Sequence, residues 1–381
     1  MRIAYVLLSP TFGMHQYTAD LAHRMMQAGH QVHLVTARRY PADRYDPAIP
    51  VICPSRAEST GFALEALQPG ACRRIAKAIE ALEPDVVHLT GPHTWNTAVM
   101  RHLQRCGIPS VHTLHDLDPH AGGAYQHLLR AWNRSVMHRA DQILVHGERY
   151  RKRLTDAGLA VDRVTFSPLL HLFVSHGGLQ EASRLARAVA YEPFVLFFGR
   201  LEPYKGLGLL IGAWSRLGST DASLVLAGAG DLSRSWVKPL PRGIELRNRL
   251  VGDREAMDLF RRCSIVVLPY SKASQSALIA AAYYFSKAVV VSPSGALPEY
   301  VVPGETGWVV DPCDEDGLAA VLGNALSGTD RLRRMGQAGR NWYERQRDQE
   351  MGVLESMYER AINGSERAQT NVKADLPTRE L

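Results

Sequence analysis

The stretch Phe194–Trp214, FVLFFGRLEPYKGLGLLIGAW, decides how the chain can fold. It opens with a continuous apolar run, Phe194–Phe198, which is typical of a strand buried on both faces of a sheet. A polar turn follows the run. After the turn, apolar residues recur with the spacing of one helix face, at Leu207, Leu210, Ile211 and Trp214. The stretch is therefore predicted to be a strand, a basic turn and a helix of an α/β domain.

The turn places two cations, Arg200 and Lys205, just after the end of the predicted strand. Ligands of open α/β sheets bind outside the carboxyl ends of the strands. A guanidinium fork and an ammonium group directed at one point suit a pyrophosphate. The alternative is that both side chains are simply solvated, and these residues alone do not decide between the two.

The pattern G-R-L-x-x-x-K-G, followed by L-x-x-L-I-x-A-W, resembles the donor-domain signature of the retaining glycosyltransferases of family 4. That family has the GT-B fold, in which two Rossmann-like domains with doubly wound parallel sheets face a cleft. In the family the Arg and the Lys hold the diphosphate of a nucleotide-sugar donor. The resemblance implies that role for Arg200 and Lys205, with Gly199 beside them. It covers Met1 to about Ile362 and is strongest from Phe194 to Pro312.

Length and composition agree with two globular domains. A chain of 381 residues, with 46% hydrophobic and 22% charged residues, is ordinary for such a protein. No apolar run approaches the roughly 18 residues that span a bilayer, and MRIAYVLLSP is expected to be a first strand, not a signal peptide. The net charge of +6 fits an anionic substrate or a lipid surface and does not require nucleic acid. We expect a cytoplasmic protein.

Contact with the inner face of the membrane is left open by one basic helix. The predicted helix Leu128–Ala140 carries the basic side chains Arg130, Arg134, His138 and Arg139. These side chains could touch anionic lipid. The interpretation that we favour is a solvated face of a core helix.

The cysteines indicate neither a disulfide framework nor a metal site. There are five, they are scattered, and no CxxC motif or Cys/His cluster shows metal-ligand spacing in the sequence. Reduced thiols are expected. Charge neutralisation is expected to fall to Arg200, Lys205 and the helix start, so we expect no metal and no cofactor apart from the donor substrate.

The first half of the chain predicts a parallel, doubly wound sheet. The expected strands are Ile3–Leu8, Val32–Thr36, Asp85–Leu89, Ser110–His115 and Gln142–His146. The expected helices are His15–Ala28, Cys72–Leu82, Thr94–Cys106 and Leu128–Ala140. Between the first strand and the first helix, Thr11–Met14 is expected to be a loop in which Gly13 either makes a tight turn or, as the resemblance implies, faces the cleft. Many relatives carry two adjacent glycines there, whereas Gly13 stands alone.

The predicted strand Ser110–His115 ends in His115-Asp116, which matches an H-D pair of the family at the same place. A histidine there can hydrogen-bond the transferred sugar or the acceptor hydroxyl, with a pKa close to the working pH. The alternative is a surface histidine that caps a turn. With Asp116, the residues His93 and Trp95 on the loop after DVVHL are candidates for the acceptor pocket.

Two further histidines, unlike His115, are not candidates for a functional site. His88 and His146 lie inside apolar strands. Side chains in such positions are usually packed in a core and satisfied there. Both are expected to be core residues and not part of a site.

The second half repeats the alternation of strands and helices. Its expected strands are Phe194–Phe198, Ser223–Ala227, Ile244–Arg247, Ser264–Leu268, Ala288–Ser292 and Gly307–Val310. The expected domains are an acceptor domain at 1–172, a linker at 173–192 and a donor domain at 193–340. A helix at 341–363 would, as in the family, cross back to the first domain. The polar residues 364–381 are expected to be a disordered tail.

A second stretch that bears on chemistry is Val266–Glu299. Its strand ends in Pro269-Tyr270, and a polar loop leads to the start of a helix, where free N–H groups can hold an anion or serine can simply cap the helix. The run resembles P-Y-x-x-x-S-Q-S of a family 4 subgroup, which implies donor binding by Tyr270, Ser274, Gln275, Ser276 and Ala277. The later loop Ser294–Glu299 matches the family's G-G-x-P-E only in part, and it adds Glu299 to the donor site.

Two carboxylates of the family are absent from this stretch. Most members carry glutamates eight residues apart, the first near the donor sugar and the second on the nucleotide ribose. Here the positions hold Ala273 and Ala281. The subgroup is known to lack one or both, so activity is not excluded. Arg249 precedes the unit that wraps the nucleobase in relatives, which makes it a further candidate for donor binding.

The sequence thus predicts an enzyme that moves a sugar from a nucleotide-diphosphate sugar to a hydroxyl of a glycan, lipid or small molecule, with retention of configuration. No covalent nucleophile is evident, so front-face attack with electrostatic stabilisation of the leaving diphosphate is expected. Two alternatives stay open. One is a sugar-nucleotide epimerase of the same fold. The other is an inactive binding or scaffold protein, which the missing glutamates would fit.

Overall fold

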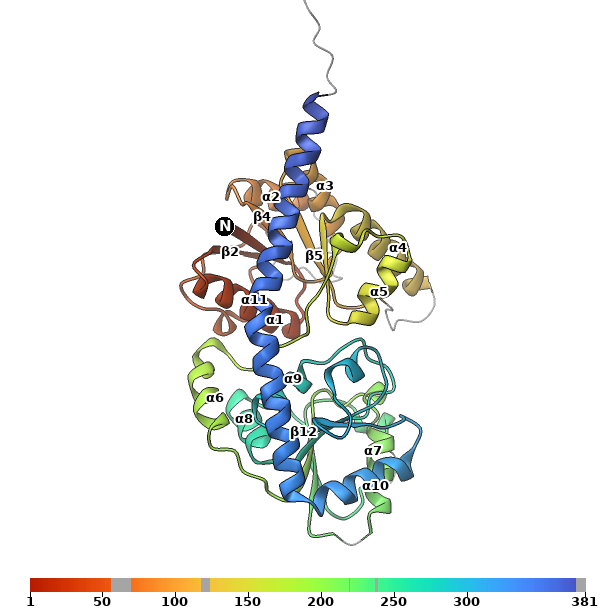
Figure 1. The fold of residues 1–381 in the computed structure, drawn as a ribbon. Coiled ribbons are helices and arrows are strands. Elements are labelled where there is room, and N and C mark those ends of the chain that lie inside the picture. Colours follow the sequence, from red (N-terminus) through yellow and green to blue (C-terminus); the bar gives the residue numbers. More distant parts are fainter. Residues whose placement is uncertain (56–69, 118–123, 219, 237–238, 375–381) are drawn as a thin grey trace, which may run out of the picture. The chain divides into compact units, whose positions relative to one another are not determined.

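The computed structural model describes residues 1–55, 70–117, 124–218, 220–236 and 239–374. The chain divides into two compact units, each with its own parallel sheet (Figure 1). The first unit is Met1–Ser167 together with the chain from Gln349 onward, and the second is Pro168–Asp348. Within the described residues no helix is both long enough and apolar enough to cross a bilayer.

The sheet of the first unit has seven parallel strands in the order β3-β2-β1-β4-β5-β6-β7. Their bounds are β1 (Arg2–Leu7), β2 (Gln31–Thr36), β3 (Val51–Ile52), β4 (Val86–Leu89), β5 (Ser110–Leu114), β6 (Gln142–Val145) and β7 (Val164–Phe166). All five predicted strands are present. β3 and β7 were not predicted, because strands of two or three residues are too short to show a periodic pattern.

Helices connect these strands, as parallel pairing requires. They are α1 (Phe12–Gln27), η1 (Ala42–Arg44), α2 (Ala71–Glu80), α3 (Asn96–Cys106), α4 (Ala124–Arg139), α5 (Glu148–Asp156) and η3 (Val161–Arg163). In α4, Arg134 and His138 are exposed while Val136 is buried, as expected for a solvated face. The side chain of Arg130 lies outside the described part.

The predicted loop Thr11–Met14 was wrong, because α1 already begins at Phe12. The Thr11 carbonyl accepts the N–H groups of Met14 and His15 at 3.0 and 3.3 Å, which closes the first helical turn. Gly13 therefore lies in this turn, and it is not among the glycines with positive φ. A tight turn at Gly13 is excluded.

The sheet of the second unit has six parallel strands in the order β10-β9-β8-β11-β12-β13. Their bounds are β8 (Phe194–Phe198), β9 (Ser223–Ala227), β10 (Ile244–Arg247), β11 (Ile265–Leu268), β12 (Ala288–Val291) and β13 (Gly307–Val309). Every predicted strand of this half is present, and β8, β9 and β10 have the predicted bounds. The interior strands β11 and β12 are buried throughout, which explains why their continuous apolar runs predicted them well.

The helices of the second unit are η4 (His176–Gly178), α6 (Leu179–Ala186), η5 (Pro203–Lys205), α7 (Leu207–Arg216), η6 (Leu232–Arg234), α8 (Asp253–Arg262), α9 (Ala277–Tyr284), η7 (Leu297–Tyr300) and α10 (Glu315–Leu326). The stretch expected to be a linker, 173–192, contains η4 and α6 and belongs to this unit. It is tied to α8, since the Ser175 N–H donates to Asp253 Oδ2 at 2.7 Å.

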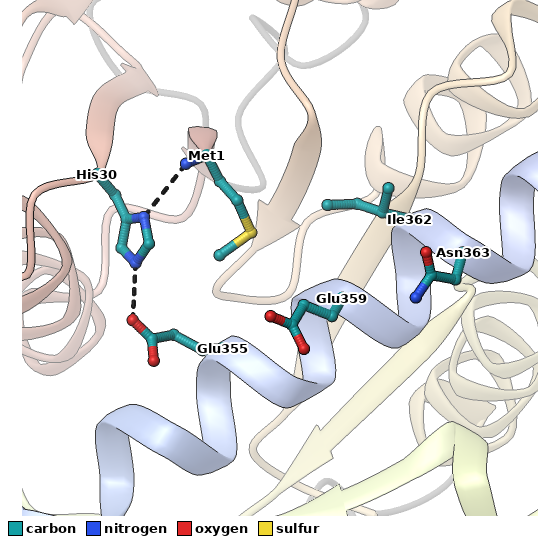
Figure 2. Close-up of a pocket in the computed structure, with 6 residues that line it drawn as sticks. All are labelled: Met1, His30, Glu355, Glu359, Ile362 and Asn363. Atoms are coloured by element: carbon teal, nitrogen blue, oxygen red, sulfur yellow. Dashed lines mark hydrogen bonds and ion pairs between the residues drawn. The ribbon is translucent and has the colours of Figure 1, made fainter.

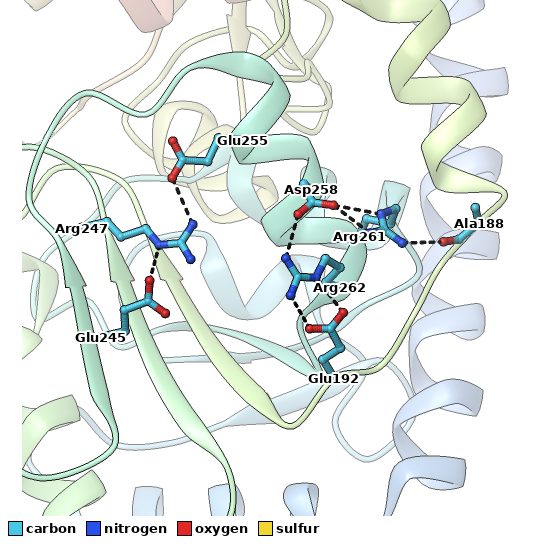
Figure 3. A network of polar contacts seen from close by, with 8 residues as sticks. All are labelled: Ala188, Glu192, Glu245, Arg247, Glu255, Asp258, Arg261 and Arg262. Carbon is cyan, nitrogen blue, oxygen red and sulfur yellow. Dashed lines mark hydrogen bonds and ion pairs between the residues drawn. The ribbon is translucent and has the colours of Figure 1, made fainter.

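A polar network holds α8 in place (Figure 3). The Arg262 guanidinium donates to both carboxylate oxygens of Glu192, at 2.5 and 2.6 Å, and to Asp258 at 2.9 Å. Near the start of the helix, Arg247 of β10 donates to Glu245 at 2.6 Å and to Glu255 at 3.0 Å. The network thus connects α8 with the segment before β8 and with the edge strand β10.

The last helix, α11 (Thr329–Ala374), begins in the second unit and continues in the first. Buried residues on one of its faces, Leu354, Met357, Tyr358 and Ala361, have the spacing of a helix stripe. The Tyr358 hydroxyl lies 3.0 Å from the Tyr5 hydroxyl and 2.8 Å from His88 Nδ1. Where the sequence predicted a disordered tail from Gly364, the helix continues to Ala374, since extending an existing helix needs no new nucleus.

A pocket of about 350 Å³ lies between the start of β1 and α11 (Figure 2). It is lined by Met1, His30, Glu355, Glu359, Ile362 and Asn363. His30 connects the two sides, with Nδ1 3.3 Å from the Met1 amino nitrogen and Nε2 2.9 Å from Glu355 Oε1. These polar contacts of His30 add to the packing of the buried apolar face of α11.

The first unit should lose stability when the pH falls from 7.5 to 5.5. Burial lowers the pKa of His15 and His115 to about 4, and that of His88 and His112 to about 3, from an ordinary value of 6.5. At pH values between the folded and the unfolded pKa of a histidine, the unfolded chain binds more protons than the folded one. The free energy of unfolding therefore decreases as the pH is lowered. We expect a loss on the order of 1 kcal/mol for each histidine, measured by urea denaturation.

Most carboxylates stay ionised down to pH 5.5, so this interval isolates the histidines. Equal unfolding midpoints at the two pH values would contradict the prediction.

Candidate active site

The second sheet changes its winding direction between β8 and β11, where its first and fourth strands are neighbours. The helical connections from the two strands at such a point run in opposite directions, and this opens a crevice at the carboxyl ends of the strands. The loops after β8, β11 and β12 are joined there by hydrogen bonds. The Ser271 N–H and hydroxyl donate to the Tyr204 carbonyl at 3.0 and 3.1 Å, and the Ala273 N–H donates to Ser294 Oγ at 2.7 Å. We call these segments, 199–206, 269–276 and 292–297, the three-loop cluster.

Two glycines allow the loops to approach this closely. Gly206 has φ +71°, and a Cβ there would lie 1.8 Å from the Pro269 carbonyl oxygen. Gly295 has φ +54°, and a Cβ there would lie 1.9 Å from the Ala273 carbonyl oxygen. Any larger residue at either position would force the backbones apart. The geometry of the cluster thus depends on these glycines.

Lys205 is packed against aromatic rings inside the cluster. Its Nζ lies 3.6 Å from the ring centroid of Tyr270 and 5.1 Å from that of Tyr204. Burial lowers the pKa of Lys205 to about 8, and the charge of Arg200 acts in the same direction. The ammonium group is therefore still charged at neutral pH but has lost much of its water. Cation–π attraction compensates part of this loss, and an anion would compensate more.

Arg200 is held by its own loop, and its side chain is 70% exposed. The guanidinium donates to Glu202 Oε1 at 2.7 Å and to the Tyr204 hydroxyl at 2.9 Å. Glu202 and Tyr204 were predicted only as parts of the polar turn. The acidic residue two positions after Arg200 was the signal in the sequence that could have revealed this pair. An exposed ion pair contributes little, so a doubly charged anion can replace Glu202 as the partner of the guanidinium.

The predicted helix start is confirmed at α9. Ser276 is its N-cap, and its side chain accepts a hydrogen bond from the Leu278 N–H at 3.4 Å. The predicted donor residues around it differ in exposure: Tyr270 is fully buried, Ser274, Gln275 and Ala277 are half-buried, and Glu299 in η7 is exposed. The Ser274 carbonyl accepts the Ala296 N–H at 2.8 Å, which ties this segment to the next loop.

Other predicted donor residues lie on neighbouring loops. Gly199 has φ +123°, and its N–H donates to the Ala227 carbonyl at 3.0 Å, beside the end of β9. Arg249 follows the edge strand β10 and donates to both carboxylate oxygens of Glu255, at 2.7 and 2.8 Å. The structure thus engages Arg249 with α8, whereas Arg200 and Lys205 belong to the three-loop cluster.

In the first unit, His115 follows the end of β5. Its Nε2–H donates to the Thr90 carbonyl at 2.8 Å, and its ring packs edge-on against Tyr17 at 5.0 Å. The prediction of a pKa close to the working pH was wrong, because burial lowers the pKa of His115 to about 4. His115 is therefore neutral at pH 7, with its proton on Nε2 and its lone pair on Nδ1.

The remaining residues predicted near the acceptor are largely built into the protein. His93 and Trp95 are buried, with ring centroids 4.8 Å apart, and the His93 carbonyl accepts from Trp132 Nε1 at 3.1 Å. The Asp116 carbonyl accepts from Asn133 Nδ2 at 3.0 Å. A role for these three in acceptor binding stays a prediction. Gly13 is exposed at the start of α1, and no atom of the described residues lies within 4 Å of the position that a Cβ would take.

The two histidines expected in the core are indeed buried there. His88 has both ring nitrogens within 2.8 Å of hydroxyl oxygens, those of Tyr358 and Thr113. His146 is buried, and its Nδ1 lies 2.9 Å from the Ser167 carbonyl oxygen.

Replacing Gly206 by alanine should cost more stability than replacing Gly218. Both glycines have φ near +70°, so both variants carry the left-handed strain of about 1–2 kcal/mol. Among the described residues, no atom lies within 4 Å of the Cβ that would be added at Gly218, whereas the Gly206 Cβ meets the Pro269 backbone. We expect a further loss of about 1–3 kcal/mol in G206A from overpacking. Denaturation of both variants measures the difference; equal losses would contradict the close approach of the two loops.

Two family models match the chain, one in each half. Residues 12–169 match the "Glycosyl transferase 4-like domain", and residues 192–327 match "Glycosyl transferases group 1". Among curated relatives, the alpha-maltose-1-phosphate synthase of Mycolicibacterium smegmatis is 28% identical over 288 residues, covering 67% of this chain and 73% of the relative. The D-inositol 3-phosphate glycosyltransferase of Streptomyces avermitilis is 25% identical over 372 residues, covering 86% and 78%.

Solved structures show the same fold. The sucrose-phosphate synthase of Thermosynechococcus elongatus has a TM-score of 0.70 at 18% identity, covering 98% of this chain and 100% of that one. Anabaena Alr3699/HepE in complex with UDP and glucose has a TM-score of 0.67 at 17% identity, covering 93% and 100%. The predicted fold class is confirmed, and the chain belongs to the family 4 glycosyltransferases, enzymes with the two-domain GT-B fold.

Proposed function

We propose that this glycosyltransferase uses a nucleotide-diphosphate sugar as donor and that Lys205 and Arg200 hold its diphosphate. The observation that carries the proposal is the position of Lys205, a desolvated ammonium group at the switch point of the second sheet. Solved relatives of the same fold have been crystallised with UDP and with UDP-glucose, which supports this class of donor.

The diphosphate gains negative charge as its bond to the sugar breaks. Charged groups placed in advance where this charge develops lower the barrier, because they need no reorganisation. Lys205 would supply an ammonium, Arg200 would exchange Glu202 for phosphate oxygens, and the start of α9 would supply N–H groups. We infer that this neutralisation suffices without a divalent metal.

Retention of configuration is part of the proposal. With Ala273 in place of the sugar-side glutamate, the loop offers no carboxylate for a covalent intermediate at that position. The acceptor hydroxyl would then attack from the face that the diphosphate leaves. Neutral His115 would hydrogen-bond that hydroxyl.

The other residues of the proposed site follow from the family resemblance. Gly13, Gly199, Arg249, Tyr270, Ser274, Gln275, Ser276, Ala277 and Glu299 are assigned to the donor, and His93, Trp95 and Asp116 to the acceptor. The acceptor is a glycan, a lipid or a small molecule.

Arg200→Ala and Lys205→Ala should each lower turnover by a hundredfold or more. Each removes one charge from the developing diphosphate, which is expected to cost about 3 kcal/mol of transition-state stabilisation. Arg216→Ala is the matched control, since Arg216 also pairs with an exposed carboxylate of the second unit, Glu315, at 2.7 Å. Formation of the glycoside, measured in EDTA, reports on all three variants.

Near-normal turnover of both site variants would overturn the assignment. Loss of wild-type activity in EDTA, restored by magnesium, would overturn the metal-free mechanism. A new sugar epimer in place of a glycoside would identify the enzyme as an epimerase.

Nucleotide affinity should fall by about tenfold between pH 7 and pH 9. Lys205 has a pKa of about 8 in the free protein, so about nine-tenths of it is neutral at pH 9. The diphosphate keeps its charge over this range, so the loss reports on the lysine. Calorimetry of the Lys205→Arg variant is the control, because guanidinium stays charged and its affinity should stay flat. A flat profile in the wild-type protein would contradict the role of Lys205.

Removing the ribose 2′-hydroxyl from the nucleotide should change affinity less than threefold. The glutamate that holds the ribose in most relatives is Ala281 here, and it lies buried within α9. A charged hydrogen bond to that hydroxyl would contribute about 1.5–3 kcal/mol, or tenfold and more in affinity. Calorimetry with several nucleoside diphosphates and their 2′-deoxy forms measures this difference.

Strong discrimination against the deoxy form would show that another side chain holds the ribose, and Tyr270 or Ser274 would be tested next. Failure of every nucleotide to bind would instead favour a binding or scaffold protein.

A further inference from the structure

Three side chains of metal-ligating types meet where α2 and α3 end. Glu80 is the last residue of α2, Cys106 is the last residue of α3, and His102 lies one turn before Cys106. His102 Nε2 is 3.1 Å from Glu80 Oε2 and 3.5 Å from Cys106 Sγ. All three ligand atoms lie within 4.8 Å of one another.

This spacing was missed in the sequence. His102 and Cys106 are four residues apart, so on a helix they share one face, which is the arrangement of the two histidines in H-E-x-x-H zinc sites. No Cys/His cluster with metal-ligand spacing was predicted from the sequence, and the structure brings His102 and Cys106 together with Glu80. The carboxylate is contributed by a different helix and could not be assigned without the packing of α2 on α3.

The distances match those around a tetrahedral zinc ion. With Zn–N and Zn–O bonds near 2.0–2.1 Å and Zn–S near 2.3 Å, neighbouring ligand atoms are separated by about 3.3 Å for N and O and about 3.6 Å for N and S. The observed 3.1 and 3.5 Å lie close to these values. The carboxylate oxygen and the sulfur also lie within 4.8 Å of each other.

The local electrostatics also favour a cation. Two helices end at this point, and the C-terminal end of a helix carries partial negative charge. The Glu80 carboxylate adds a full charge beside the thiol. A divalent cation bound here would be coordinated by the thiolate form of Cys106, since a coordinating thiol is deprotonated.

We propose that Glu80, His102 and Cys106 form a binding site for a divalent cation of the zinc class, with water as the fourth ligand. The ligand set of one sulfur, one nitrogen and one oxygen favours zinc over magnesium or calcium, which prefer oxygen alone. The cation would fasten the end of α2 to the end of α3. None of these residues belongs to the three-loop cluster, so the site is independent of the proposed sugar transfer.

Cobalt(II) reports on such a site directly, because a thiolate ligand adds a charge-transfer band in the near ultraviolet. The metal-free, reduced protein should bind one cobalt ion with this band, and zinc should displace it. Cys106→Ser should abolish the band, and His102→Ala should weaken cobalt binding by about a hundredfold or more. Cys313→Ser is the matched control, since Cys313 is also exposed but belongs to no group of potential ligands among the described residues.

Alkylation of the wild-type protein provides a second measurement that needs no variant. Both Cys106 and Cys313 should react with iodoacetamide in EDTA, and zinc should protect Cys106 alone, as read by peptide mass spectrometry. Absence of the cobalt band, its persistence in C106S, or equal alkylation of Cys106 with and without zinc would each overturn the proposal.

Discussion

The close contact between the loops after β8 and β11 is the constraint on which the second unit's site depends. Gly206 lies so near the Pro269 carbonyl that no Cβ fits, and this approach sets Lys205 over the ring of Tyr270. Taking an ammonium group out of water is unfavourable, and the aromatic ring returns only part of the cost. The contact between the loops therefore holds the ammonium group of Lys205 in a partly desolvated position. There it would bind an anion more strongly than it would on the open surface.

The three-loop cluster is rich in cationic side chains and poor in carboxylates, and this determines which ligands suit it. Two positions that are acidic in most of the family are Ala273 and Ala281, and Ala281 is packed inside α9. Of the charged groups, Arg200 keeps a carboxylate partner, Glu202, only in an exposed pair. A donor held here would be anchored by its diphosphate, whose charges are complementary to the site, and less by its ribose.

The first unit depends on a different interaction, the burial of neutral polar side chains. A chain of contacts runs from Tyr5 to Tyr358 of α11, on to His88, and through Thr113 to the hydroxyl of Tyr17. Tyr17 in turn packs against His115. Such a network is favourable only if every member keeps its partners. Burial beside this network lowers the pKa of His115 to about 4, so His115 is neutral at pH 7.

The sequence by itself determined the parallel α/β architecture, because the buried strands are continuous apolar runs. In the helices between them, apolar residues recur with a period of 3.6 residues. It also placed Arg200, Lys205 and Tyr270 at strand ends, since that follows from chain order. Only the tertiary structure decided which loops meet, because contacts such as Ser271 with Tyr204 and Glu80 with His102 join residues distant in the chain. It alone decided the charge states as well: the pKa values of Lys205 and His115 depend on burial, which no local pattern encodes.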